Sequence, residues 1–450
     1  MTAAESLPED HLLDEVTEFC SRLIQFDTSN FGGGESRGER EAAEWVAEQL
    51  AEVGYEPLVL ESAPRRANTV VRIPGADPDA PALLVHGHLD VVPAMVDDWS
   101  VGPFSGEIRD GSIWGRGALD MKDMVAMMLA VARDVARHGV TLPRDVVLAF
   151  VADEEDKGDL GAQFLVREHA DLLEGVTTAI GESGGFAVHL PNGGRVYPIA
   201  TGERGSAWMT VTAKGTAGHG SRANPDNAVS NLVRVLAALS DLHWPVTVIP
   251  SVAALLSGLS EHLGIEVDPT DPESLAQLGD AARLVTGTLS NTVNPTMLSA
   301  GYKHNVIPTV AVGGVDGRIL PGAETSFFES VDAILGDRVT REFASFAAPV
   351  SASHDSTEFA AMAAAIRVHD PDALVLPYCM AGGTDAKAFN RLGIDCYGFA
   401  PGQNPPGVSD YDLVHGVDEH VRIDSLEFGV RVLASYLNAS PTPRDGPGTS

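Results

Sequence analysis

Residues 83–90 read Leu83-Leu84-Val85-His86-Gly87-His88-Leu89-Asp90, an apolar run that ends in His-x-His-x-Asp. The run is typical of a buried parallel strand that presents polar side chains at its carboxyl end, where open α/β sheets hold their sites. Alternate residues of a strand share a face, so His86, His88 and Asp90 can point the same way. This spacing suits a metal-binding histidine whose second ring nitrogen needs a partner, but it also fits a buried histidine satisfied by a carboxylate.

Strand and helix patterns alternate on both sides of this stretch, and polar residues follow the strands. Asp120 follows a glycine-rich turn and precedes a predicted helix over Lys122 to His138. A strand over Asp145 to Ala152 runs directly into Asp153-Glu154-Glu155-Asp156, and the next strand ends just before Glu182. This alternation predicts a doubly wound α/β domain with its site at the carboxyl ends of the strands.

The pattern changes after about residue 201. Trp208 to Ala213 alternates as a half-exposed antiparallel strand does, and a helix pattern covers Asp226 to Leu239. A loop-rich insert follows, and then further strands and one helix. The α/β pattern returns from about residue 351. The sequence therefore predicts a catalytic domain in two pieces, residues 1–202 and 351–450, with an inserted α+β, ferredoxin-like domain over residues 203–350.

Composition narrows the classes of function. The 450 residues include 63 acidic and 30 basic ones, a formal net charge of −33, which argues against nucleic acid and anionic membranes as partners. No apolar run is long enough to span a bilayer. The first ten residues lack the basic and apolar regions of a signal peptide, and the three cysteines show no C-x-x-C spacing, so we expect a cytoplasmic protein.

Five candidate ligands lie at or just beyond predicted strand ends: His88, Asp120, Glu155, Glu182 and His415. Nitrogen and carboxylate donors without thiolates suit zinc, cobalt or manganese. Two histidines and three carboxylates divide between two metals if one carboxylate bridges them. Glu154, next to Glu155, is then left as a general base. So many neighbouring acids repel one another, and bound divalent cations would remove that repulsion.

Several motifs, taken together, closely resemble the di-zinc metallopeptidases that include aminoacylase, succinyl-diaminopimelate desuccinylase and glutamate carboxypeptidase. They occur in the family's order over nearly the whole chain: His88-Leu89-Asp90-Val91-Val92-Pro93, Trp114-Gly115-Arg116-Gly117-Ala118-Leu119-Asp120-Met121-Lys122, Asp153-Glu154-Glu155, Gly218-His219-Gly220-Ser221, Asn305-Val306-Ile307-Pro308, Arg318, Gly382-Gly383-Thr384-Asp385 and Leu413-Val414-His415-Gly416.

The resemblance implies a role for each candidate in the first domain. His88, Asp120 and Glu182 would hold one zinc, and Asp120 would bridge to a second zinc held by Glu155 and His415. Glu154 would take the proton from the bridging water and pass it to the leaving nitrogen. Asp90 would hydrogen-bond the back of the His88 ring. The resemblance also implies a cis peptide between Asp120 and Met121.

For the inserted domain, the resemblance implies a lid that also forms a homodimer. His219 would reach the active site of the partner subunit and stabilise the oxyanion. Asn305, Arg318, Gly383 and Thr384 would bind the substrate, with Arg318 gripping its free carboxylate. The implied activity is metal-dependent hydrolysis of the amide bond of an N-acyl amino acid, a dipeptide or another short peptide with a free carboxylate.

Alternatives remain at three points. Gly181-Glu182-Ser183-Gly184-Gly185 satisfies G-x-S-x-G, and Asp385 and His415 follow in the order of a serine hydrolase. Against this, the serine should open a helix, yet residues 191–194 read Pro-Asn-Gly-Gly. A catalytically inactive metal-binding or peptide-binding homologue is a second alternative, which the presence of Glu154 disfavours. His420 competes with His415 as a ligand, and the Leu-Val and Gly around His415 favour His415.

Overall fold

The computed structural model describes residues 10–409 and 412–439. Most of the amino-terminal stretch on which the expected cytoplasmic location rests lies outside these residues. The chain divides into two compact units, the first being Met1–Thr201, Ala352–Pro377 and Thr384–Ser450, the second Gly202–Ser351 and Tyr378–Gly383. The short segment Tyr378–Gly383, expected in the first domain, packs with the second unit in the structure.

A mixed sheet forms the centre of the first unit. Along its main path the strand order is β10-β11-β20-β9-β5-β8-β4-β3. The four central strands β20, β9, β5 and β8 are parallel, whereas the neighbours on both sides pair antiparallel. The strands are β3 (Leu58–Ala63), β4 (Arg66–Ile73), β5 (Ala82–His88), β8 (Val146–Val151), β9 (Val176–Gly181), β10 (Val188–His189), β11 (Arg195–Glu203) and β20 (Asp395–Gly398); β18 (Val350–Ser351) and β19 (Leu374–Met380) pair with β11.

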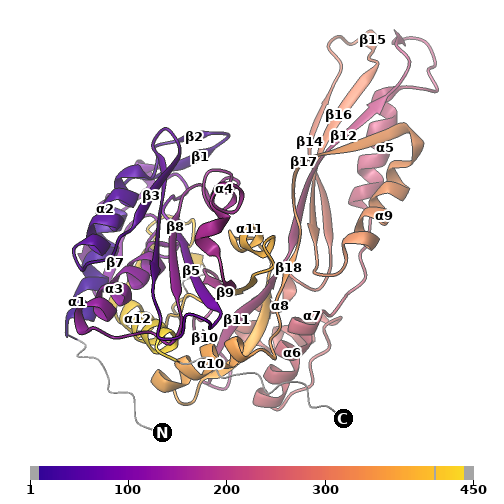
Figure 1. Cartoon of the computed structure of the whole chain (residues 1–450). Coiled ribbons are helices and arrows are strands. Elements are labelled where there is room, and N and C mark those ends of the chain that lie inside the picture. The colour runs from indigo at the N-terminus through magenta and orange to yellow at the C-terminus, as the bar shows by residue number, and fades with distance from the viewer. Residues whose placement is uncertain (1–9, 410–411, 440–450) are drawn as a thin grey trace. The chain divides into compact units, whose positions relative to one another are not determined.

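Helices cover both faces of this sheet (Figure 1). On one side α3 packs against β5, and α1 and α12 pack on α3; on the other, α11 packs against β9 and β20 and contacts α4. The helices are α1 (Asp10–Ile24), α2 (Arg40–Ala51), α3 (Lys122–His138), α4 (Ala162–Glu168), α10 (Thr357–His369), α11 (Ala386–Asn390) and α12 (Ile423–Leu437). Small sheets join β1 (Asn30–Gly32) to β2 (Glu35–Ser36), and β21 (His420–Arg422) to β7 (Ser112–Trp114) and β6 (Glu107–Arg109). The predicted doubly wound α/β architecture is confirmed.

Tight packing between β5 and α3 fixes the strand that carries His88. All seven residues of β5 are buried, as expected of a central parallel strand. A side chain at Gly87 would come within 3.1 to 3.3 Å of Val125, Met121 and Met128. The helix begins and ends at the predicted residues, and Gly139 caps it in the left-handed conformation with φ 61°. The carboxyl end of β5 is therefore held against a rigid helix.

The second unit is the predicted α+β domain. Its antiparallel sheet has the order β14-β16-β12-β17, and α5 and α9 pack on it in the β-α-β-β-α-β sequence of a ferredoxin-like fold. The elements are β12 (Gly205–Lys214), α5 (Ala228–Ser240), β14 (Thr292–Ala300), β16 (Val310–Ile319), α9 (Glu324–Leu335) and β17 (Val339–Ala347), with a separate pair β13 (Gly218–His219) and β15 (Val306–Ile307).

Several helices were not predicted. The insert expected to be loop-rich contains α6 (Pro250–Leu263), with shorter α7 (Pro272–Ala276) and α8 (Arg283–Thr286) after it. In α6, Val252, Leu255 and Leu259 are buried at helical spacing between Pro250 in the first turn and a left-handed Gly264. Helix α12 was also missed. Among the described residues, no helix has both the length and the apolar character that a membrane span requires.

Candidate metal centre

Neighbouring parallel strands of the first unit bring three of the predicted ligands to one edge of the sheet. His88 is the last residue of β5 and pairs with Val151 at the end of β8, just before Glu154 and Glu155. Strand β9, on the other side of β5, ends at Gly181 and is followed by Glu182. Asp120 lies two residues before the start of α3, and its peptide bond to Met121 is cis, as the resemblance implied.

Asp120 lies between the two histidines. His88 Nε2 is 3.0 Å from one Asp120 carboxylate oxygen, and His415 Nε2 is 3.0 Å from the other. His415 Nε2 is also 3.3 Å from Glu155 Oε2, and His88 Nε2 is 3.9 Å from Glu182 Oε2. In the sets His88, Asp120, Glu155 and His88, Glu154, Glu182, the potential ligand atoms all lie within 4.8 Å of one another. The structure thus brings together all five predicted ligands and Glu154.

The orientation of the His88 ring differs from the prediction in one detail. Its Nδ1 donates to the backbone carbonyl of Asp90 at 2.9 Å, while the nearest Asp90 carboxylate oxygen is 3.7 Å away. The expected carboxylate–histidine hydrogen bond is therefore replaced by a backbone one. A proton on Nδ1 leaves the Nε2 lone pair of the neutral ring facing the carboxylate oxygens of Asp120 and Glu182, the arrangement of a metal-binding histidine.

Buried negative charge dominates the electrostatics of this cluster. Burial, followed by the charge of Glu182, raises the pKa of Glu154 well above its usual value. Burial and the charge of Asp120 raise the pKa of Glu182 in the same way. Hydrogen bonds to Asp120 and Glu155 raise the pKa of His415 to about 10. Glu154, Glu182 and His415 thus all favour the protonated form here, as expected of a site built for cations.

The donors present fit divalent metal ions. They are two imidazoles and several carboxylates, the ligand types that zinc, cobalt and manganese accept. Glu155 Oε1 is buried and forms no hydrogen bond within the described residues, so it has a lone pair available for a cation. Asp120 presents one carboxylate oxygen to each histidine.

A buried ion pair that the sequence analysis missed fastens the loop that carries His415. Arg116 Nη1 donates to Glu419 at 2.5 Å, and its Nη2 donates to the backbone carbonyl of His415 at 3.2 Å. The other carboxylate oxygen of Glu419 accepts the backbone N–H of Leu119, next to Asp120. Two ligand loops distant in sequence are thus joined. The pairing depends on the fold, so no local sequence pattern could reveal it.

Three predicted residues of the second unit, His219, Arg318 and Asn305, form hydrogen bonds within that unit. His219 is exposed on β13, and its Nδ1 is 2.9 Å from the hydroxyl of Ser221. Arg318, on β16, donates from Nε and Nη2 to the carboxylate of Asp316. Asn305 is exposed next to β15, and its carbonyl accepts the N–H of Gly220. Gly383 belongs to the second unit and Thr384 to the first, so the chain passes between units at this motif.

The structure also tests two alternatives, His420 as a metal ligand in place of His415 and Ser183 as the nucleophile of a serine hydrolase. His420 stacks on Trp114 with ring centroids 4.2 Å apart, and its Nδ1 bonds the carbonyl of Asp418. His415, by contrast, contacts Asp120 and Glu155.

Ser183 has a φ of 71°, which a nucleophile elbow would show, but the next element after it is β10, a strand. The helix that a serine hydrolase places there does not follow.

Comparison with known proteins gives one family and a consistent fold. The model of peptidase family M20/M25/M40 matches residues 84–439. Aminoacylase-1 of Sus scrofa is 28% identical over 88% of this chain and 89% of its own length. The N-fatty-acyl-amino acid synthase/hydrolase of Homo sapiens is 29% identical over 83% of this chain and 77% of its own.

Two solved structures share the fold. The M20 family metallo-carboxypeptidase of Sulfolobus solfataricus aligns with a TM-score of 0.68 and 20% identity, over 96% of this chain and 99% of that one. A dipeptidase of Saccharomyces cerevisiae aligns with a TM-score of 0.65 and 17% identity, over 96% and 98% of the two chains.

Proposed function

Because the chain belongs to peptidase family M20/M25/M40, we propose that it is a metal-dependent hydrolase of the amide bond in N-acyl amino acids or short peptides with a free carboxylate. Its similarity to aminoacylase-1 over most of both chains supports this substrate class. The observation that carries the proposal is the position of Asp120 between His88 and His415, with Glu154 in the same cluster.

We assign the metal ligands as follows. His88, Asp120 and Glu182 would hold one divalent ion, and Asp120, Glu155 and His415 a second. Zinc fits the mixed imidazole and carboxylate donors best, with cobalt and manganese as alternatives. When bound, two such ions supply Lewis acidity that polarises the substrate carbonyl and makes water a nucleophile near neutral pH.

Glu154 is the general base in this proposal. It takes the proton of the attacking water and passes it to the leaving nitrogen. Burial and Glu182 raise its pKa, so a carboxyl group at this place can hold a proton between the two steps. Bound cations would bring that pKa back toward the working pH.

The remaining assignments concern the second unit and the assembly. His219 would stabilise the oxyanion in the active site of a partner subunit, so the protein would be a homodimer formed through this unit. Asn305, Arg318, Gly383 and Thr384 would bind the substrate. Because Asp316 already engages Nε and Nη2 of Arg318, a substrate carboxylate would bind at Nη1 or compete with Asp316. We place the protein in the cytoplasm.

Hydrolysis of a panel of N-acetyl amino acids and dipeptides, with metal analysis, tests the proposal. Glu154→Gln is expected to keep its metal and lose roughly 10²- to 10⁴-fold in kcat, the usual contribution of general acid–base catalysis. Glu155→Gln, the neighbouring control, is expected to lose metal as well as turnover. Unchanged turnover in Glu154→Gln would remove this residue from the mechanism, and no turnover of any substrate would favour an inactive homologue.

Metal removal separates this mechanism from serine catalysis. Dialysis against a chelator is expected to abolish hydrolysis, and added zinc or cobalt to restore it, while Ser183→Ala leaves kcat within a few-fold of the native value. Hydrolysis that survives the chelator but is lost in Ser183→Ala would support the serine route instead.

A further inference from the structure

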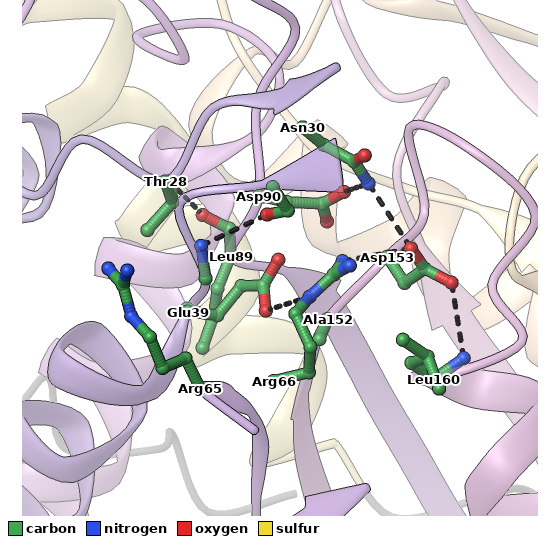
Figure 2. Close-up of polar contacts among 12 residues, drawn as sticks. Thr28, Asn30, Glu39, Arg65, Arg66, Leu89, Asp90, Ala152, Asp153 and Leu160 are labelled. Carbon is green, nitrogen blue, oxygen red and sulfur yellow. Dashed lines mark hydrogen bonds and ion pairs between the residues drawn. The ribbon is translucent and has the colours of Figure 1, made fainter. Parts of the chain in front are cut away.

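A buried polar network (Figure 2) contacts the loop that carries Glu154 and Glu155, and apart from Asp90 its members have no catalytic assignment. It consists of Glu39, Arg66, Asp153, Asn30 and Asp90, each no more than 5% exposed. These residues come from the start of α2, strand β4, the end of β8, strand β1 and the residues after β5. The network thus joins five separate segments of the first unit.

Asn30 is the residue that connects the two halves of the network. Its Nδ2 amide donates to Asp90 Oδ2 at 2.9 Å and to Asp153 Oδ1 at 3.2 Å. Arg66 donates from Nη2 to the same Asp153 oxygen at 2.8 Å, and from Nε to Glu39 at 2.7 Å. The carboxylates of Asp90 and Asp153 are therefore held apart by donors that lie between and beside them.

Both carboxylates act on the backbone of the loop with the proposed base. Asp90 accepts the backbone N–H of Glu154 at 3.1 Å and that of Glu155 at 3.2 Å. Asp153 accepts the N–H of Leu160 at 3.1 Å, and its own backbone takes a left-handed φ of 70° directly before Glu154. The side chains of Asp90 and Asp153 thus fix the backbone from which the Glu154 and Glu155 side chains project.

Stability alone is a weak reason for such a network. Arg66 pairs with two buried carboxylates, Glu39 and Asp153, while the third, Asp90, is hydrogen-bonded to Asn30. Burying charges costs free energy that their mutual attraction often fails to recover. Apolar side chains of similar volume can replace buried ion pairs with little loss. A geometric role explains the network better, because Asp90 directs both carboxylate oxygens at backbone groups of Glu154 and Glu155.

We propose that Asn30 and Arg66 are positioning residues: they orient Asp90 and Asp153 so that the Glu154 and Glu155 carboxylates keep their working places. This inference rests on the proposed function. Neither residue is among the proposed metal ligands or substrate-binding residues; each acts through the loop over residues 153–160. A displacement of about 1 Å at a reacting group can cost roughly 100-fold in rate, so small errors in this loop matter.

The test uses Asn30→Ala and Arg66→Met, with Arg144→Met as the matched control. Arg144 is as buried as Arg66 and makes a two-pronged ion pair with Glu358, but it precedes β8, whereas Asp153 follows the carboxyl end of that strand. Steady-state kinetics on the best substrate, cobalt binding with the visible spectrum of the cobalt-loaded protein, and thermal unfolding are measured for each. Asn30→Ala and Arg66→Met are expected to lose roughly 10- to 100-fold in kcat with KM nearly unchanged, and to shift the cobalt spectrum through Glu155.

Arg144→Met is expected to lose stability but to keep the native kcat and cobalt spectrum. Native kcat and spectrum in folded Asn30→Ala and Arg66→Met would overturn the proposal, as would an equal loss of kcat in Arg144→Met. If those two variants do not fold, Arg66→Lys gives the same decision, because it keeps the charge but cannot reach Glu39 and Asp153 together. A native protein that hydrolyses nothing would instead contradict the proposed function, and the cobalt spectra would still test the positioning role.

Discussion

At the residue scale, the two candidate histidine ligands carry protons that a metal must displace. The pKa of His415 is raised to about 10 by hydrogen bonds to Asp120 and Glu155, so the metal-free ring is protonated at pH 7. Burial lowers the pKa of His88, but Asp120 and Glu182 outweigh it and raise the pKa well above the usual value. Metal binding requires both rings in the neutral form.

We therefore expect metal loading at pH 7 to release protons, and the apparent metal affinity to rise with pH up to about 10. Calorimetric titration of the chelator-treated protein with zinc, in two buffers with different ionisation enthalpies, measures the number of protons released. At least one proton is expected for a filled site, since His415 alone supplies one. Identical heats in the two buffers would contradict this electrostatic description.

Glu39 makes stability depend on pH in the opposite sense to an ordinary paired acid. Burial, followed by the charge of Asp90, raises its pKa from 4.5 to about 7. The folded state thus binds this proton more tightly than the unfolded state, and the stabilisation is present below pH 4.5 and lost as the pH rises to 7. Glu39→Gln has no such proton. Urea unfolding of the metal-free protein is expected to show that the native chain loses about 2 kcal/mol relative to Glu39→Gln between pH 5 and 8. If the free energy of unfolding changes with pH in the same way in both proteins, Glu39 does not titrate in this range.

At the scale of elements, local patterns predict helices, whereas contacts between distant segments leave no such pattern. Helix α3 was predicted at both ends because its apolar spacing and Gly139 are local signals. In α12, the non-buried residues Asp424, Glu427, Arg431 and Ser435 follow helical spacing opposite buried ones, so the amphipathic pattern was present in the sequence and was not used. The strand ends that carry His88, Glu155 and Glu182 were predictable from apolar runs that stop at polar residues. The Arg66–Asp153 ion pair was not, because its partners are 87 residues apart.

Gly429, in the middle of α12, tests this packing. By helix propensity alone, Gly429→Ala would gain up to about 1 kcal/mol. In the structure, however, an alanine Cβ would lie 2.2 Å from the carbonyl oxygen of Pro401 and 2.6 Å from Met127 Sδ. A backbone carbonyl cannot swing aside, and overpacking of this kind costs about 1–3 kcal/mol. We expect a net loss of up to about 2 kcal/mol in the free energy of unfolding, measured with urea. A gain would mean that α12 does not lie against Pro401.

At the scale of the whole molecule, the candidate catalytic residues are divided between two compact units. The metal ligands and Glu154 belong to the first unit, whereas His219 belongs to the second. If His219 serves a partner subunit, each active site needs two chains, and activity depends on which substitutions share a chain. A His219 that completes the site of its own subunit and a His219 that completes the site of the partner therefore predict opposite activities for mixed dimers.

Two hybrids, each purified by different tags on its two chains, decide between these arrangements. In the first, one chain carries His219→Ala and the other Glu154→Gln; a partner-supplied His219 leaves one complete site of two, so about half of the native activity is expected. In the second, a native chain is paired with a chain that carries both substitutions, and neither site is complete, so activity is expected to be lost. If His219 acts within its own subunit, the first hybrid is inactive and the second retains half. Gel filtration of each hybrid confirms that the compared species are dimers, because dissociated chains would be inactive in either hybrid under the partner-supplied arrangement.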